Sequence, residues 1–199
     1  LQSNTSLTEC KLRKNELGVE GWTTIFNALR DSPTSKITTW DLFDERLGPE
    51  IAKPLAEYLS ITPSLTKLSI SGNSIGDDGK YAIGAAVGSS MRRLVCDQLD
   101  LRADSTKLNL SNKGLGPGDA ALIAGGLRAF MGSITHIGEG GLDLRSNGLG
   151  DEGWGAIFAG VCSSKASKIA SINASYKDIG PKGAKLIAEA LRTSVNPSL

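Results

Sequence analysis

The stretch that decides the fold is LDLRSNGLGDEG, residues 142–153. Within it, Gly148, Gly150 and Gly153 have the spacing G-x-G-x-x-G, after a short apolar segment. In that context the spacing is typical of a dinucleotide-binding loop. A second stretch, GNSIG at residues 72–76, has the G-x-S-x-G spacing of a hydrolase nucleophile elbow. The first question is whether these glycines serve chemistry or architecture.

Internal repetition favours architecture. A Leu-Gly or Ile-Gly dipeptide recurs at residues 17, 47, 75, 115, 149 and 179. Upstream of each copy lies the frame L-x-x-L-x-L-x-x-N-x-L, and downstream lie apolar pairs at helical i, i+4 spacing. Alternating leucines predict a short strand with one buried face. Each copy is therefore predicted to be one strand and one helix, stacked on its neighbours as a solenoid.

Alignment of the copies argues against a chemical role for the two enzyme-like motifs. The slot of Gly148 holds different residues in the other copies: Glu16, Arg46, Ser74, Gly114 and Asp178. The next strand, IASINAS, also lacks the acidic residue that a dinucleotide site needs. We interpret both motifs as strand-to-helix turns at an unconstrained slot. The sequence predicts no enzyme: no catalytic residue, cofactor or metal site.

The frame, its 28–30-residue period and the L-G-x-x-G entry to each helix resemble the leucine-rich repeat of the ribonuclease-inhibitor-like class. That class also includes activators of the Ran GTPase and the sensor regions of NOD-like receptors. The resemblance implies an α/β leucine-rich-repeat solenoid, a curved horseshoe segment with parallel strands on the concave face and helices on the convex face. It also implies a binding scaffold.

The repeats define one expected domain, residues 1–199. Strand–helix repeats are placed near 7–36, 37–64, 65–90, 105–133, 134–168 and 169–196. Residues 91–104 are predicted to be a short, irregular strand-bearing unit. Residues 132–141 lengthen the next connection, either as a specificity element or as a tolerated loop. Since neither end has a clear polar cap, the chain is expected to be a fragment, with further repeats or domains at both ends.

Odd and even copies differ in their turns. Odd copies have Asn before the dipeptide, whereas even copies have a charged residue, such as Glu45, and Pro after the glycine. Because a carboxylate cannot both donate and accept hydrogen bonds as an amide does, the even turns are expected to depend on proline or water. Trp22 and Trp154 in odd helices are predicted to pack in the core, with an exposed docking patch as the alternative.

The composition of the chain argues against several classes of function. With 22 basic and 21 acidic residues, the net charge of +1 gives no reason to expect nucleic acid. No apolar run approaches the roughly 18 residues of a membrane span. Three scattered cysteines are predicted to be free thiols in a reducing, cytoplasmic setting.

The predicted function is therefore a non-catalytic protein–protein interaction scaffold. Alternatives are a GTPase-activator-like regulator of a small GTPase and the ligand-sensing segment of a NOD-like receptor. A protein partner is expected on the concave face, where side chains between the leucines point. The candidate partner-binding residues are Lys11, Arg13, Asp41, Phe43, Lys67, Lys107, Asn109, Asp143, Arg145 and Tyr176.

Overall fold

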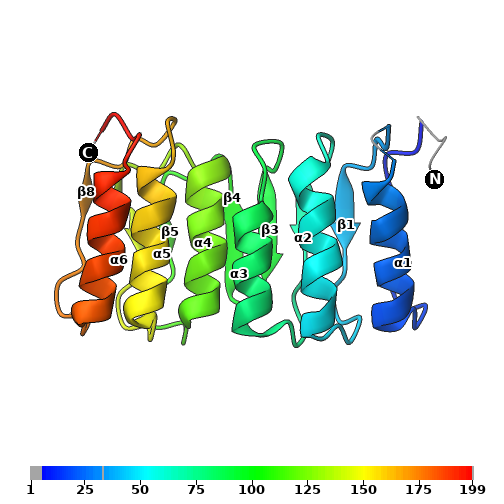
Figure 1. Ribbon diagram of the computed structural model, residues 1–199, viewed down its shortest axis with the longest axis horizontal. Helices are drawn as coiled ribbons and strands as arrows, with labels where there is room; N and C mark the ends of the chain where they lie inside the picture. Colours follow the sequence, from blue (N-terminus) through cyan, green and yellow to red (C-terminus); the bar gives the residue numbers. More distant parts are fainter. Residues whose placement is uncertain (1–5, 33, 199) are drawn as a thin grey trace. The chain divides into compact units, whose positions relative to one another are not determined.

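The computed structural model describes residues 6–32 and 34–198. The chain forms two compact units, Leu1–Asp100 and Leu101–Leu199. In both units strands and helices alternate along the chain (Figure 1), as the repeat predicts. None of the helices in the described part of the chain is long and apolar enough to cross a membrane.

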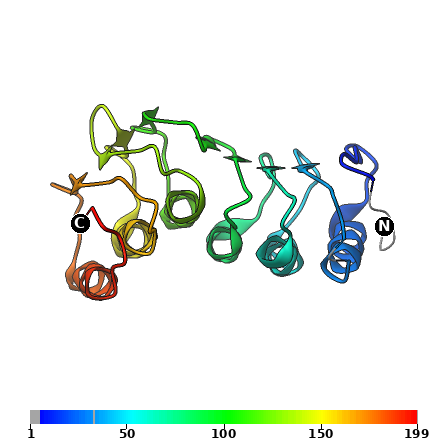
Figure 2. The ribbon, with the colours of Figure 1, turned by 90° about the horizontal axis from the view of Figure 1, so that it is seen from above.

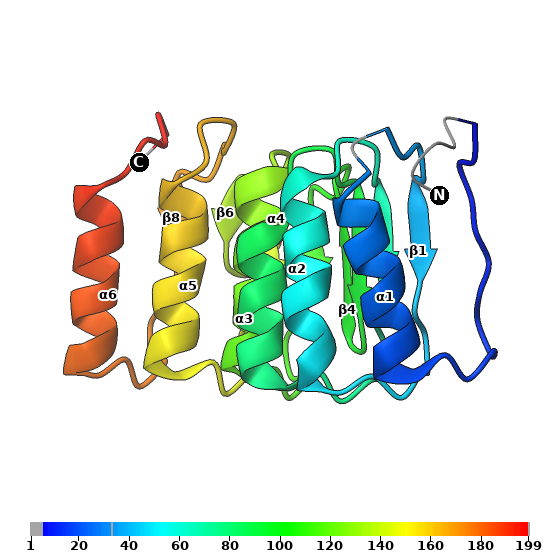
Figure 3. The same cartoon turned by 45° about the vertical axis from the view of Figure 1, so that its right-hand side comes forward.

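The first unit has three helices and a sheet of short strands. Its helices are α1 (Gly18–Arg30), α2 (Ala52–Ile61), which continues the 3-10 turn η1 (Pro49–Ile51), and α3 (Gly76–Ala86). Its parallel strands are β1 (Thr39–Asp41), β2 (Lys67–Ser69) and β3 (Arg93–Cys96). Residues 6–16 run beside β1 (Figure 3), where the strand predicted for the first repeat is reduced to a single bridge between Glu9 and Thr39.

The irregular segment 91–104 forms a hairpin. Strand β4 (Leu99–Arg102) lies next to β3 in the sheet, and only Asp97 and Gln98 separate the two strands. A two-residue connection between neighbouring strands makes a hairpin, so β4 runs antiparallel to β3. The prediction of a strand-bearing unit is correct, but the unit contains two strands and interrupts the parallel order.

The second unit has helices α4 (Pro117–Ala129), α5 (Gly150–Cys162) and α6 (Pro181–Arg192), packed in that order. Its strands are β5 (Leu108–Asn109), β6 (His136–Ile137), β7 (Leu142–Asp143) and β8 (Ser171–Ile172). All four strands are parallel, in the spatial order β5-β7-β6-β8.

Strand β6 corrects the expectation that residues 132–141 only lengthen a connection. This insertion adds a strand between β7 and β8, although just four residues join β6 to β7. The short return depends on glycine. Gly138 and Gly140 have φ values of +147° and +86°, and a Cβ on Gly141 would lie 2.4 Å from the carbonyl oxygen of His136.

Within each unit the helices lie on one side of the strands (Figure 2), and the leucine frame fills the space between them. Frame positions are buried in the middle copies, among them Leu42, Leu68, Ile70, Leu110, Leu142 and Leu144. In the outermost copies the corresponding Leu12 and Ile172 are only half-buried. The core is therefore built between neighbouring repeats, as expected for stacked units.

In two of the odd copies, asparagine ties the turn to the repeat before it. The Asn147 side-chain amide donates to Leu110 O at 2.8 Å and to its own turn at Leu144 O at 3.1 Å. Its Oδ1 accepts from the backbone amide of Leu115 at 3.1 Å. Asn73 spans its turn and the preceding one in the same way, through Leu42 O at 2.7 Å and Ile70 O at 2.9 Å.

Glu45, in the same slot, corrects a second expectation. Its buried carboxylate accepts from the backbone amide of Lys14 at 2.9 Å and from Trp22 Nε1 at 3.2 Å. Like the amide oxygen of asparagine, the carboxylate accepts a hydrogen bond from the backbone, and a buried indole N–H supplies a second donor. This turn does not need water in place of the amide.

The same Leu-Gly or Ile-Gly dipeptide adopts two backbone conformations. In the odd copies the glycine is left-handed, with φ values of +61°, +72° and +64° at Gly18, Gly76 and Gly150. In the even copies the glycine is extended, at Gly48, Gly116 and Gly180. Each extended glycine precedes a proline, which disfavours helical backbone at the residue before it and begins the helix itself.

The three glycines of residues 148–153 now have separate explanations. Gly150 takes the left-handed turn, and a Cβ on Gly153 would lie 3.1 Å from the Cβ of Ala120 on the neighbouring helix. Gly148 is not left-handed, so nothing there requires glycine. The slot is nevertheless constrained in other copies, which corrects the sequence interpretation. Positive φ values occur at Glu16, Arg46, Gly114 and Asp178.

The predicted core role of the tryptophans is confirmed. Trp22 and Trp154 are both buried. Trp22 stacks on Phe26 at 5.8 Å between ring centroids and meets Trp40 edge-on at 5.6 Å, and Phe26 also stacks on Tyr58 at 5.7 Å. Aromatic side chains thus join α1, β1 and α2 in one cluster.

Candidate functional site

Three predicted residues meet on the strand face of the first unit. Arg13 Nη1 lies 3.2 Å from Asp41 Oδ2, and the Arg13 guanidinium carbon lies 4.9 Å from the centroid of the Phe43 ring. Phe43 is 44% exposed, unlike the leucines beside it. An arginine stacked on an exposed aromatic ring is a common anchor in protein interfaces.

A depression of about 390 Å³ adjoins this cluster. It is lined by Glu9, Cys10, Lys11, Arg13, Thr39, Asp41 and Lys67. Lys11 forms an ion pair with Glu9 at 3.3 Å, with the two side chains 81% and 57% exposed. Pairs this exposed contribute little to stability, so Lys11 can exchange its partner readily.

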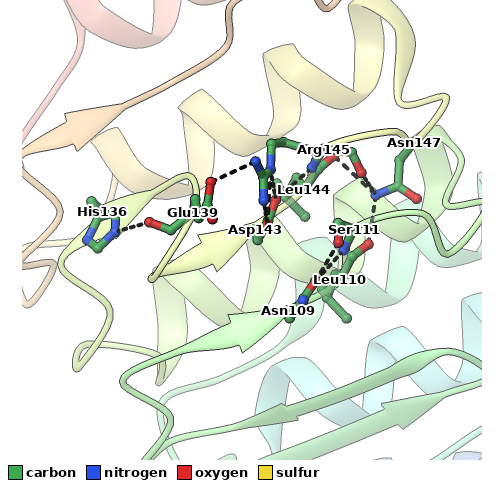
Figure 4. Close-up of polar contacts among 9 residues, drawn as sticks. All are labelled: Asn109, Leu110, Ser111, His136, Glu139, Asp143, Leu144, Arg145 and Asn147. Atoms are coloured by element: carbon green, nitrogen blue, oxygen red, sulfur yellow. Dashed lines mark hydrogen bonds and ion pairs between the residues drawn. The ribbon is translucent and has the colours of Figure 1, made fainter.

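The second unit presents a more rigid arrangement (Figure 4). Arg145 donates to both carboxylate oxygens of Asp143, at 3.0 and 2.8 Å, and its other terminal nitrogen reaches Glu139 at 2.8 Å. Asp143 is only 4% exposed. The hydrogen bonds from Arg145 lower the pKa of Asp143, against the opposing effect of burial.

The remaining predicted residues of this unit do not join that group through a direct side-chain bond. Asn109 pairs with Asp143 in the strand register, but its Oδ1 accepts from the amide and hydroxyl of Ser111 at 2.9 and 2.7 Å. Lys107 is exposed. Tyr176 is fully exposed and has a φ of +55°, a backbone conformation that favours glycine.

Comparisons with known proteins agree with this geometry. The leucine rich repeat family matches residues 63–84 and 142–158. The ribonuclease inhibitor of Sus scrofa is 30% identical over 192 residues, 96% of this chain and 38% of that protein. Ran GTPase-activating protein 1 of Xenopus laevis is 30% identical over 132 residues, 64% of this chain and 21% of that protein.

The chain is a leucine-rich repeat protein. Within this family it is ribonuclease-inhibitor-like, because the similarity to the inhibitor covers nearly all of its repeats. The chain spans less than two fifths of the length of either relative. Proteins of this class are non-enzymatic binding scaffolds, which directs attention to the strand faces.

The candidate residues predicted from the sequence leave out four side chains that the structure places beside them in this leucine-rich repeat protein: Glu9, Thr39, Arg93 and Glu139. Glu9 and Thr39 are paired across neighbouring strands, and Arg93 is paired with Lys67 in the register of β2 and β3. Arg93 could have been found by extending the repeat frame into residues 91–104. Glu139, which holds Arg145, had no such signal because it lies in the insertion and is placed by the short strand β6.

Proposed function

We propose that this leucine-rich repeat protein is a non-catalytic scaffold that binds a protein partner through the strand faces of its two units. The exposed Arg13–Phe43 stack carries this proposal. Interfaces concentrate their binding energy in arginine and aromatic side chains, and solvation alone gives no reason to keep Phe43 outside the core. The porcine relative is a ribonuclease inhibitor, and a protein that inhibits another protein supports a binding role by analogy.

Charge reversal on the strand faces tests the proposal. The chain is immobilised, and captured proteins are compared between wild type, Arg13→Glu and Arg145→Glu. Matched controls are Lys53→Glu and Lys185→Glu, which reverse exposed charges on α2 and α6. A partner bound through the strand faces is lost with the arginine variants and kept with the lysine variants. Capture that ignores both arginine variants contradicts the proposal.

A second function, regulation of a small GTPase, is favoured by the match to Ran GTPase-activating protein 1 over 132 residues. In this case the chain contributes a surface that acts on the catalysis of another protein. Single-turnover GTP hydrolysis by Ran and other small GTPases, with and without the chain, distinguishes the two functions. If the chain changes the hydrolysis rate of none of the GTPases tested, regulation of a small GTPase is contradicted and the scaffold function remains.

The cysteines support a reducing, cytoplasmic setting for either function. Among the described residues no disulfide joins the three cysteines, of which Cys96 and Cys162 are buried and Cys10 is half-buried. Disulfides are rare in that compartment. Alkylation of the chain in cell extracts, with and without prior reduction, measures whether the thiols are free.

A further inference from the structure

We propose that the strand face of the first unit binds an extended acidic segment of its partner protein. One carboxylate of that segment lies over Lys67 and Lys11, and an apolar side chain packs on Phe43. The inference rests on the proposed scaffold function and names the chemistry of the partner.

Lys67 offers a cation that the fold itself does not neutralise. Its neighbours across the sheet are Thr39 on one side and Arg93 on the other. Arg93 is held by Asp100 through two hydrogen bonds, at 2.8 and 2.9 Å. Within residues 6–32 and 34–198 no acidic group lies within 4.0 Å of the Lys67 ammonium. Lys67 is therefore available to a carboxylate from outside.

With Lys67 included, the depression carries one net positive charge. Three cations line it, Lys11, Arg13 and Lys67, against the two carboxylates Glu9 and Asp41. Both internal ion pairs are solvent-accessible, since the side chains of Arg13 and Asp41 are 39% and 41% exposed. An incoming carboxylate can displace Glu9 from Lys11 at little cost. The surface is thus complementary to negative charge.

Phe43 supplies the apolar part of the surface. It lies four residues beyond Thr39, and Thr39 is level with Lys67 in the sheet. Four residues of extended chain cover about 13 Å, so a carboxylate at Lys67 and a side chain on Phe43 should be about four residues apart in an extended peptide. The depression of about 390 Å³ has room for side chains of this kind.

The second unit argues against a general affinity for acids. There Arg145 already faces two carboxylates, Asp143 and Glu139, and offers no free charge. Arg145 is therefore not a second site for the acidic segment, which gives a direct internal comparison with Lys67.

Fluorescence polarisation of the intact chain tests the assignment. The probe is a fluorescein-labelled peptide with two glutamates, three serines and a phenylalanine, in that order, which places the second glutamate and the phenylalanine four residues apart. One control peptide has the same composition with phenylalanine next to the glutamates, and another has lysine for glutamate. The protein variants are Lys67→Glu, Lys67→Gln and Phe43→Ser, with Lys53→Glu as the matched charge control on α2.

Wild type should bind the spaced peptide about tenfold more tightly than either control peptide. Lys67→Glu should weaken binding by about tenfold or more, and Lys67→Gln and Phe43→Ser by several-fold. Lys53→Glu should stay within about twofold of wild type. Circular dichroism of each variant checks that the repeats remain folded.

Equal binding of all three peptides, or equal effects of Lys67→Glu and Lys53→Glu, overturns the assignment. So does a single-stranded oligonucleotide that binds as tightly as the peptide and ignores Phe43→Ser, since that is a site for polyanions. If the peptide fails while partner capture still depends on Arg13 and Arg145, this inference is wrong and the scaffold stands. Peptide binding that depends on Lys67, with capture that ignores both arginines, supports this site and contradicts the scaffold.

Discussion

The two units differ in how their helices pack. In the first unit large aromatic rings fill the space between α1, β1 and α2: Trp22, Phe26 and Trp40 contact one another, and Tyr58 stacks on Phe26. In the second unit helices α4 and α5 approach so closely that a Cβ on Gly160 would lie 2.5 Å from the carbonyl oxygen of Ala124. One repeat pattern thus tolerates both solutions, because only the total volume has to be filled.

Their strand faces differ as well. In the first unit Arg13 has a single exposed ion pair and rests on Phe43, whereas in the second Arg145 is fixed by a buried Asp143. The first face is adaptable and the second is preorganised. We therefore expect the stability of the first unit to be more sensitive to lost side-chain volume. The stability of the second unit should be more sensitive to added volume and to the loss of its arginine.

Removing volume should be most damaging in the first unit. Trp22→Ala deletes the centre of the aromatic cluster, so the free energy of unfolding should fall by about 3–5 kcal/mol. Chemical denaturation followed by circular dichroism measures it. Trp22→Phe keeps a ring but loses the bond to Glu45 and part of the indole volume, so a smaller loss is expected. An unchanged stability for Trp22→Ala would contradict the core role.

Adding volume should be most damaging in the second unit. Gly160→Ala places a methyl group against the backbone of α4, which cannot move as a side chain can. We expect a loss of about 3 kcal/mol, measured by the same denaturation. Ala159→Ser, one residue earlier on the exposed side of α5, is the matched control and should be nearly neutral. Equal stabilities for the two variants would show that α4 and α5 can separate.

Loss of the strand-face arginine should also cost more stability in the second unit than in the first. Arg145→Met removes the side-chain donors of a buried carboxylate and leaves it the backbone amide of residue 145, and should cost about 2 kcal/mol at neutral pH. Arg13→Met breaks an exposed pair and should cost under about 1 kcal/mol. Denaturation of both variants at one pH makes the comparison, and a larger loss for Arg13→Met would reverse it.

The pKa of Asp143 gives the pH dependence of that difference. Because Arg145 lowers this pKa in the folded state, the stabilisation is complete above about pH 4 and is lost as the pH falls through the folded pKa. In Arg145→Met the pKa of Asp143 should rise, since burial then acts without the side-chain hydrogen bonds and the charge of Arg145. NMR titration of the carboxyl carbon in both proteins measures the shift.

The smallest effect should be the same in both units. Gly18→Ala and Gly150→Ala each place a side chain at a φ near +60°, with no other atom within 4 Å of the new Cβ. The cost is backbone conformation alone, about 1 kcal/mol in each case. Gly148→Ala, whose nearest contact is at 3.9 Å and whose φ is not left-handed, should be almost neutral. A large loss for Gly148→Ala would reinstate a special role for the first glycine of residues 148–153.

Much of the fold was accessible from the repeat. The frame predicted all six helices, and the burial of Leu68 and Leu142 follows from the alternation that marks a strand. The hairpin of residues 93–102 was not predicted as such, because its turn, Asp97 and Gln98, lacks the glycine that usually marks a two-residue hairpin. Strand β6 was not predicted because it depends on pairing with the distant strand β8. Of the candidate site, Arg13, Asp41 and Phe43 were named without any indication that they touch.

By itself the sequence determined the local conformations of this leucine-rich repeat protein. Proline after glycine selects the extended turn, and glycine without proline takes the left-handed one, because each preference belongs to one residue and its neighbour. Only the tertiary structure decided which charges remain free. Lys67 and Arg145 are both basic residues beside frame leucines, but Arg145 meets Asp143 and Glu139, while Lys67 meets no acid within the described residues. Ion pairing depends on which side chains the fold brings within a few ångströms, and no spacing along the chain specifies that.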